Sequence, residues 1–540
     1  MKRIIALLLV GIMSVGLLGG CGNGSDTSAS TTSSASGSPA ASGSNTSTTS
    51  GQPRVLNVGM SSAVSTLSPF ALVSMGMYST VSTYYETLLA FNRDRNMYQN
   101  QVAKSVTKVD DTTYDIEIYD YVTDSKGNKI TADDIKYDYD TAVKEGKLAQ
   151  ALGLMNSIEK TGDYTLRLKM KSMLNGALET VLSAVPVIAK KEYEASKDQM
   201  ATSNVGTGRY VITKYVAGSS ISVKKRADYW QKDELCADQS QGPADEVNFI
   251  TIPEDSQLAI ALETGTVNVT RLQATTAGRF IDNKDFDQFT TLSPSGFMLY
   301  FNGDSHSPFA GNKELRQAVC YAFDRQAFGK GAYNGYYEDM HELAVPDVAG
   351  YQKKWLDEDF YNYDPAKAKE LLAKAGYKPG QLNVKLLVLN MPVYNTIATV
   401  MQAELAEIGI TLTIESKDAA TWLAQKDDGK SYDLLMYNVA SNDMTMNWAV
   451  SMSQEVFGKD RGSVAFVKDD KMEELLQGCM KVNNHTDENI QAAHEYMKDM
   501  AYYYPTVCPK QYAFASKDLE LSDLGYAMNA LLLPSFFKFK

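Results

Sequence analysis

Histidine and cysteine are scarce in this chain of 540 residues, which has four histidines and five cysteines. The histidines form no H-x-x-x-H pair and no cluster with cysteine, and no G-x-S-x-G motif is present. The residue patterns of a zinc site and of a serine hydrolase are therefore missing. The sequence argues against an enzyme, against a metal site and against a resident cofactor.

The cysteines are also far apart. Beyond Cys21 they are Cys236, Cys320, Cys479 and Cys508, and none forms a C-x-x-C pair. Two disulfides are possible in an exported protein, although sequence alone cannot pair them. Buried free thiols are the interpretation that we prefer.

The chain has no excess of basic residues, because it contains 52 Lys and Arg and 65 Asp and Glu. Residues 1–20 contain Lys2 and Arg3, so a chain without them carries 50 − 65 = −15 charges. This balance argues against nucleic acid as a partner and against direct adhesion to an anionic membrane.

Long apolar runs are absent except near the N-terminus, from Ile4 to Leu18. This run is shorter than the ~20 residues that a membrane span needs. It follows Lys2 and Arg3 and ends in Leu18-Gly-Gly-Cys21, which resembles a bacterial lipobox. We interpret 1–20 as a lipoprotein signal peptide and Cys21 as the lipidated N-terminus. A transmembrane anchor and an ordinary secretory signal are the alternatives.

A low-complexity segment follows the lipobox. Residues 22–52 contain no aromatic residue and no Lys or Arg. Such a segment cannot bury enough apolar area to order itself. We therefore expect residues 21–53 to be the lipidated cysteine and a disordered linker, which tethers the rest of the chain to the membrane.

The body alternates strand and helix patterns. Period-two alternation predicts strands at 54–60, 113–119 and 164–170, and a helix is expected from about Met77 to Leu89. The glycines of Val205-Gly-Thr-Gly-Arg-Tyr210 suggest a tight chain reversal. They do not continue into a phosphate-binding loop.

The clearest α/β unit lies between Asp364 and Ile414. Asp364-Pro365 predicts the start of a helix that Gly376 ends, and 382–389 reads as a strand covered on both faces. A second helix with apolar residues on one face and a strand at 410–414 follow. This order predicts a parallel crossover.

Several short motifs occur in a fixed order along the chain. They are Thr131-Ala-Asp-Asp-Ile-Lys-Tyr137, Val205-Gly-Thr-Gly-Arg-Tyr210, Arg226-Ala-Asp-Tyr-Trp230, Ala261-Leu-Glu-Thr-Gly265, Leu299-Tyr-Phe-Asn302, Pro308-Phe309, Glu314-Leu-Arg-Gln-Ala318, Tyr321-Ala-Phe-Asp-Arg325, Tyr363-Asp-Pro365, Ala375-Gly-Tyr377 and Glu404-Leu-Ala-Glu-Ile-Gly409. Together they resemble the family 5 solute-binding proteins of ABC importers, which carry oligopeptides, dipeptides and nickel.

The resemblance implies an α/β fold with two lobes of the class II periplasmic-binding-protein type and an additional inserted domain. Lobe one would comprise 54–90, 205–297 and 511–540, the inserted domain 91–204, and lobe two 298–510. A ligand would bind in the cleft between the lobes, which close over it. The membrane permease would recognise the closed form.

The resemblance also suggests ligand-binding residues. Asp443 aligns loosely with an acid that captures a peptide's α-ammonium, although the family's usual Trp near 438–439 is absent. On lobe one the segment Ser74, Met75, Gly76, Met77 and Tyr78 aligns with backbone that pairs with an extended peptide, and the start of a helix is the alternative. The remaining candidates for the cleft are Tyr437, Asn442, Trp448 and Tyr512.

The function implied is that of a monomeric, membrane-tethered receptor that delivers peptides to an ABC permease from the extracytoplasmic face. A receptor of the same fold for a sugar or a nickel chelate is an alternative, as is a peptide sensor. The sequence cannot separate import from sensing, because the two differ in partner and share the pocket.

Overall fold

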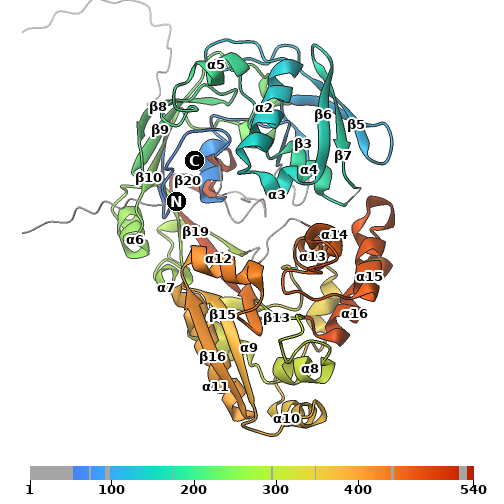
Figure 1. Cartoon of the computed structure of the whole chain (residues 1–540). Coiled ribbons are helices and arrows are strands. Elements are labelled where there is room, and N and C mark those ends of the chain that lie inside the picture. Colours follow the sequence, from blue (N-terminus) through green and yellow to red (C-terminus); the bar gives the residue numbers. More distant parts are fainter. Residues whose placement is uncertain are drawn as a thin grey trace, which may run out of the picture. The chain divides into compact units, whose positions relative to one another are not determined.

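The computed structural model describes residues 53–71, 75–91, 98–172, 174–293, 296–346, 348–438, 443–521 and 532–540. Cys21, Ser74 and Asn442 lie outside these residues. Pro53–Lys540 is one compact unit (Figure 1).

An eight-stranded sheet is built from both ends and the middle of the chain. Its order is β12-β19-β11-β1-β10-β9-β8, and β14 pairs with β19. Its strands are β1 (Val55–Met60), β8 (Tyr210–Val216), β9 (Ser220–Lys225), β10 (Glu246–Thr251), β11 (Val269–Leu272), β12 (Phe286–Leu292), β14 (Tyr337–Asp339) and β19 (Val507–Ser516). The helices α6 (Asp255–Glu263) and α7 (Ala274–Ala277) pack on it.

A five-stranded sheet is formed by the second half of the chain, in the order β16-β15-β17-β13-β18. Its strands are β13 (Met298–Phe301), β15 (Leu382–Leu389), β16 (Ile410–Lys417), β17 (Leu434–Tyr437) and β18 (Tyr503–Pro505). The helices of this region are α8 (Lys313–Tyr321), α9 (Arg325–Tyr333), α10 (Pro365–Lys374), α11 (Pro392–Glu407), α12 (Ala419–Asp428), α13 (Met444–Met452), α14 (Gln454–Phe457), α15 (Asp470–Met480) and α16 (Asp487–Met500).

Residues 98–200 hold a separate antiparallel sheet in the order β4-β5-β7-β6. Its strands are β4 (Ala103–Lys108), β5 (Thr113–Ile118), β6 (Met155–Gly162) and β7 (Thr165–Met170), and α2 (Ala132–Glu145) packs on it (Figure 1). The short helices α3 (Ala149–Leu152), α4 (Ala177–Leu182) and α5 (Lys190–Ala195) complete this part. Elsewhere β2 (Leu89–Phe91) pairs with β3 (Tyr98–Asn100), and β20 (Leu519–Leu521) with β21 (Phe537–Phe539).

The crossover predicted between Asp364 and Ile414 is confirmed. Asp364 caps α10 by accepting a hydrogen bond from the Lys367 N–H, with Pro365 in the first turn. β15 and β16 pair in parallel and α11 packs on both. We predicted that both faces of the strand at 382–389 are covered. This is wrong for the first half of the strand, where the side chains of Asn383 and Lys385 are exposed.

The helix expected from Met77 to Leu89 is too long. α1 spans Met75–Val81, and Leu89 lies in β2. Between them the chain is held by the loop before β8, because Gly208 N–H donates to Tyr84 O at 3.1 Å and Tyr210 N–H to Thr83 O at 2.9 Å. This non-local pairing replaces the helical hydrogen bonds that the local pattern predicts.

The same contact corrects our interpretation of the glycine pair before Tyr210. Neither Gly206 nor Gly208 has a positive φ, so a tight turn does not require them. A Cβ on Gly206 would lie 2.0 Å from Tyr84 O, and one on Gly208 2.5 Å from Tyr84 C. The glycines let two backbones approach each other closely.

The thiols of the four described cysteines are free. Cys320, Cys479 and Cys508 are buried, and Cys236 is half-buried. The preference for free thiols over disulfides is therefore confirmed. Burial raises the pKa of Cys236 to about 11, so this thiol stays protonated near neutral pH.

Candidate ligand-binding site

Asp443 is a buried carboxylate at the start of α13, with 6% of its surface exposed. Its Oδ1 accepts hydrogen bonds from Met446 N at 3.0 Å and from Thr445 Oγ1 at 2.6 Å. It therefore acts as the N-cap of α13, where a negative charge also interacts favourably with the helix dipole.

The second oxygen of Asp443 faces the part of the chain that was predicted as an inserted domain. Asn175 Nδ2 donates to Asp443 Oδ2 at 2.7 Å, and the Asn175 N–H donates to Met480 O at 2.7 Å. His485 Nε2 lies 3.7 Å from the same Oδ2. Protein groups thus hold this carboxylate from two sides, and its role as an ammonium anchor stays a prediction.

Tyr437 is half-buried at the end of β17. Its ring stacks on Trp422 with centroids 5.9 Å apart, and Lys426 Nζ lies 5.8 Å from its centroid. Burial raises the pKa of its hydroxyl. The side chain is a rigid aromatic surface a few residues before Asp443.

Trp448 is fully buried in α13. Its Nε1 donates to Glu342 Oε1 at 3.2 Å, and Glu342 Oε2 lies 2.7 Å from His494 Nδ1. His494 Nε2 in turn lies 3.2 Å from Glu358 Oε2. A ligand would reach the Trp448 indole only after its neighbours moved, so its role in the cleft stays a prediction.

The lobe-one candidates begin α1. Residues 75–81 are helical and the Tyr78 carbonyl accepts from Ser82 N–H at 3.0 Å, so the alternative of a helix start describes this segment. Tyr78 is half-buried against the main core. Pairing of Met75, Gly76 and Met77 with a peptide stays a prediction.

Tyr512 belongs to β19 and is 5% exposed. Its ring lies in the smaller core, with Leu272, Phe280 and Phe514, and meets Tyr336 edge to face at 5.8 Å. Burial raises the pKa of its hydroxyl. The ring thus packs on one face of the eight-stranded sheet, and its predicted place in the cleft is untested.

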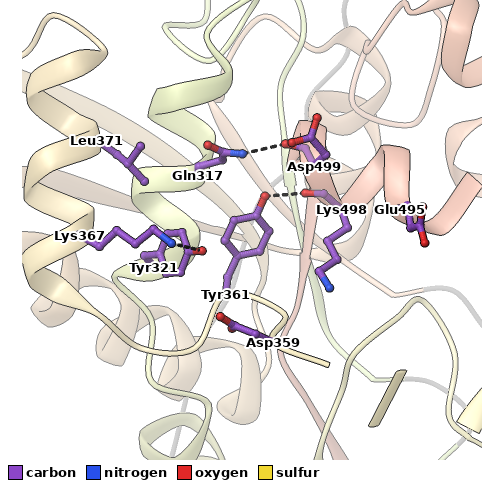
Figure 2. A pocket seen from close by; sticks show the side chains of 9 residues that line it. All are labelled: Gln317, Tyr321, Asp359, Tyr361, Lys367, Leu371, Glu495, Lys498 and Asp499. Carbon is purple, nitrogen blue, oxygen red and sulfur yellow. Dashed lines mark hydrogen bonds between the residues drawn. The ribbon is translucent and has the colours of Figure 1, made fainter. Parts of the chain in front are cut away.

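A cavity of about 380 Å³ lies between α8, α10 and α16, away from every predicted site residue. Figure 2 shows its lining residues. Lys367 Nζ donates to Tyr321 Oη at 2.6 Å, and Tyr361 Oη donates to the Lys498 carbonyl at 2.5 Å. These polar groups thus hydrogen-bond to one another.

Sequence reasoning missed Asn175 and His485, because both reach Asp443 from distant parts of the chain. No local motif marks either residue. Among the described residues, no group of three or more His, Cys, Asp or Glu side chains could hold a metal ion. In the same part of the chain no helix has the length and apolar run of a membrane span.

Comparison with known proteins places the chain in a family. The model of the bacterial extracellular solute-binding proteins, family 5 (middle) matches residues 97–458. The glutathione-binding protein GsiB of Salmonella typhi is 24% identical over 493 residues, which cover 87% of this chain and 93% of GsiB.

Solved structures share the fold. The oligopeptide-binding protein AppA from Bacillus subtilis, in complex with a nonapeptide, has a TM-score of 0.70 at 18% identity, over 91% of this chain and 100% of AppA. AgaA from A. tumefacien R10, in complex with agropinic acid, has a TM-score of 0.72 at 21% identity, over 90% of this chain and 99% of AgaA.

These likenesses define the fold as an α/β fold with two lobes, as the sequence predicted. The chain belongs to the family 5 bacterial extracellular solute-binding proteins.

Proposed function

We propose that this protein is the receptor of an ABC importer, that it binds short peptides between its two lobes, and that it performs no chemistry of its own. The observation that carries the proposal is the match to GsiB over 493 residues, because glutathione is a peptide. AppA, with its bound nonapeptide, supports the same ligand class. The permease is the proposed partner, and the chain acts as a monomer.

The buried Asp443 carboxylate is the proposed anchor for the peptide's α-ammonium. A carboxylate with 6% exposure pairs with a cation more strongly than a solvated one. Removing such a partner costs about 2–5 kcal/mol of binding free energy. Tyr437, Asn442 and Trp448 are proposed neighbours of this anchor, and Ser74–Tyr78 and Tyr512 are proposed lobe-one contacts.

Asp443→Asn tests this anchor. Asparagine still caps a helix, so α13 keeps its start while the charge is lost. We expect peptides recovered from the purified protein to bind at least tenfold more weakly in calorimetry. N-acetylated forms of the same peptides should bind the two proteins equally weakly.

The double variant Asn175→Asp with Asp443→Asn is the matched control. It restores a hydrogen bond between the two side chains and moves the carboxylate to position 175. Affinity should stay low. Recovered affinity would show that the carboxylate need not stand at position 443, and an unchanged affinity in Asp443→Asn would remove Asp443 from the site.

A lipid anchor at Cys21 is the second part of the proposal. It rests on the sequence Leu18-Gly-Gly-Cys21 after an apolar leader, and it would hold the receptor at high effective concentration near its permease on the extracytoplasmic face. Cys21→Ser should move the protein from the membrane fraction to the soluble fraction and lower uptake while ligand affinity stays the same. A serine variant that stayed in the membrane fraction would disprove the anchor.

A receptor for another solute is the second candidate. AgaA binds agropinic acid on the same fold, and position 438 is Asn in this chain, where peptide-binding members usually have Trp nearby. A single non-peptide solute bound to the purified protein would favour this candidate.

A further inference from the structure

Arg271 lies near the carboxyl end of β11, a central strand of the eight-stranded sheet. β11 runs parallel to β1, with Val58 opposite Val269 and Gly59 opposite Thr270. If the register is followed one residue further, Met60, the last residue of β1, comes next to Arg271. On the other side, Arg271 pairs with Ala513 of β19.

The side chain of Arg271 is on the face of the sheet that carries the main core. Val269 belongs to that core, whereas Leu272 belongs to the smaller one. Because successive side chains of a strand alternate, Arg271 shares a face with Val269 and with Ala513 opposite it. Tyr512 is on the other face, with Leu272.

This end of the sheet is also where the chain passes to the other sheet. β12 ends at Leu292, and the next strand, β13, belongs to the five-stranded sheet. β19 begins at Val507, directly after β18 of the five-stranded sheet. Ligands of α/β proteins bind beyond the carboxyl ends of the strands, so Arg271 has the position of a ligand-binding residue.

The guanidinium has no counterion among the residues that the structure describes. Among the described residues, no ion pair, hydrogen bond or ring contact involves the Arg271 side chain. Burial lowers its pKa to about 10, so it is still charged at neutral pH. Arg271 nevertheless keeps part of its surface exposed. A desolvated charge that stays unpaired costs free energy.

A second unsatisfied group is close by. Gln511 lies two residues before Ala513 on β19, on the same face, and its Oε1 is buried with no hydrogen-bond partner among the described residues. Residues so placed on neighbouring strands are diagonal neighbours, about 7–8 Å apart. The helix α1 also reaches this corner, because Thr80 Oγ1 donates to Met60 Sδ at 3.5 Å.

We propose that Arg271 binds a carboxylate of the solute and that Gln511 Oε1 accepts a hydrogen bond from an N–H group next to it. The planar guanidinium grips a carboxylate with two parallel hydrogen bonds. The C-terminal end of a peptide offers both groups. This inference rests on the proposed function for the ligand class, and its site is on the eight-stranded sheet, whereas Asp443 is on α13.

Arg271→Met is the decisive variant, because methionine fills similar space without charge. Peptides of two to six residues with free C-termini should raise the unfolding temperature of the wild-type protein, and the same peptides amidated at the C-terminus should raise it much less. In Arg271→Met the affinity for the free acids should fall at least tenfold, and the preference over amides should vanish. Arg271→Lys should retain part of the preference.

The ligand-free protein gives an independent readout. Since no described residue pairs with Arg271, Arg271→Met should unfold at a higher temperature than the wild type when no ligand is present. A structural ion pair would give the opposite sign. Arg279→Gln is the control, because Arg279 is exposed and pairs with Glu263 at 3.5 Å, and it should change neither affinity nor acid preference.

The outcomes separate this inference from the proposed function. Equal binding of acids and amides, retained affinity in Arg271→Met, or a lower unfolding temperature for that variant would each overturn the inference. If a sugar acid stabilised the wild type when no peptide did, Arg271→Met would be expected to abolish that effect. In that case the proposal of peptide binding would be wrong, and the assignment of Arg271 to a carboxylate would stand. If nothing in the panel stabilised the wild type, the sign of the change in unfolding temperature would decide.

Discussion

Glu404 is a buried acid on α11, with 8% of its surface exposed. Its Oε1 accepts from the Asp324 N–H at 3.3 Å, and its Oε2 is buried without a hydrogen-bond partner in the described part of the chain. Burial raises the pKa of this carboxyl from its ordinary value of 4.5 to about 8. The folded protein therefore favours the neutral acid.

This pKa makes stability depend on pH. Between pH 4.5 and about 8 the folded protein binds more protons at Glu404 than the unfolded chain does, so stability should fall as pH rises through this window. Each pKa unit corresponds to about 1.4 kcal/mol, which gives a loss of a few kcal/mol. Urea unfolding at pH 5 and pH 8 measures it.

Glu404→Gln should remove most of this pH dependence, because glutamine is neutral throughout. Glu407→Gln is the matched control, since Glu407 is exposed on the same helix and makes the smallest contribution to the raised pKa of Glu404, and it should change the pH dependence little. A Glu404→Gln protein whose stability still fell between pH 5 and pH 8 by the wild-type amount would contradict the account.

At the scale of the element, local signals predicted structure well. The cap at Asp364, the proline after it and the apolar face of α11 specify a helix, a strand and a helix in order, and β15 and β16 pair as expected. Each of these signals acts within a few residues of the chain. Such patterns need no knowledge of distant partners.

The elements that sequence reasoning missed depend on distant contacts. Thr83 and Tyr84 leave the helical pattern because the loop at Gly208 pairs with them across more than 120 residues. The ligand site shows the same limit. Asp443 could be suggested by family resemblance, but Asn175 meets it only in three dimensions. That no described residue pairs with Arg271 is a property of the folded surroundings and leaves no mark in the sequence.

At the scale of the whole molecule, the connections between the two large sheets fit a receptor whose lobes close on a solute. The chain passes between the sheets after Leu292 and again before Val507, and in between the short strand β14 pairs with β19 of the eight-stranded sheet. The predicted start of lobe two at 298 coincides with the start of β13. The predicted return at 511 falls inside β19, which joins the eight-stranded sheet from Val507. The domain boundaries themselves stay predictions.

Native mass spectrometry of the protein, purified without refolding, tests the central claim most directly, because it identifies a bound solute by its mass. We predict a heterogeneous set of short peptides with free α-ammonium and carboxylate groups, released when the protein unfolds. A single sugar or a single metal chelate bound to the protein would contradict peptide binding.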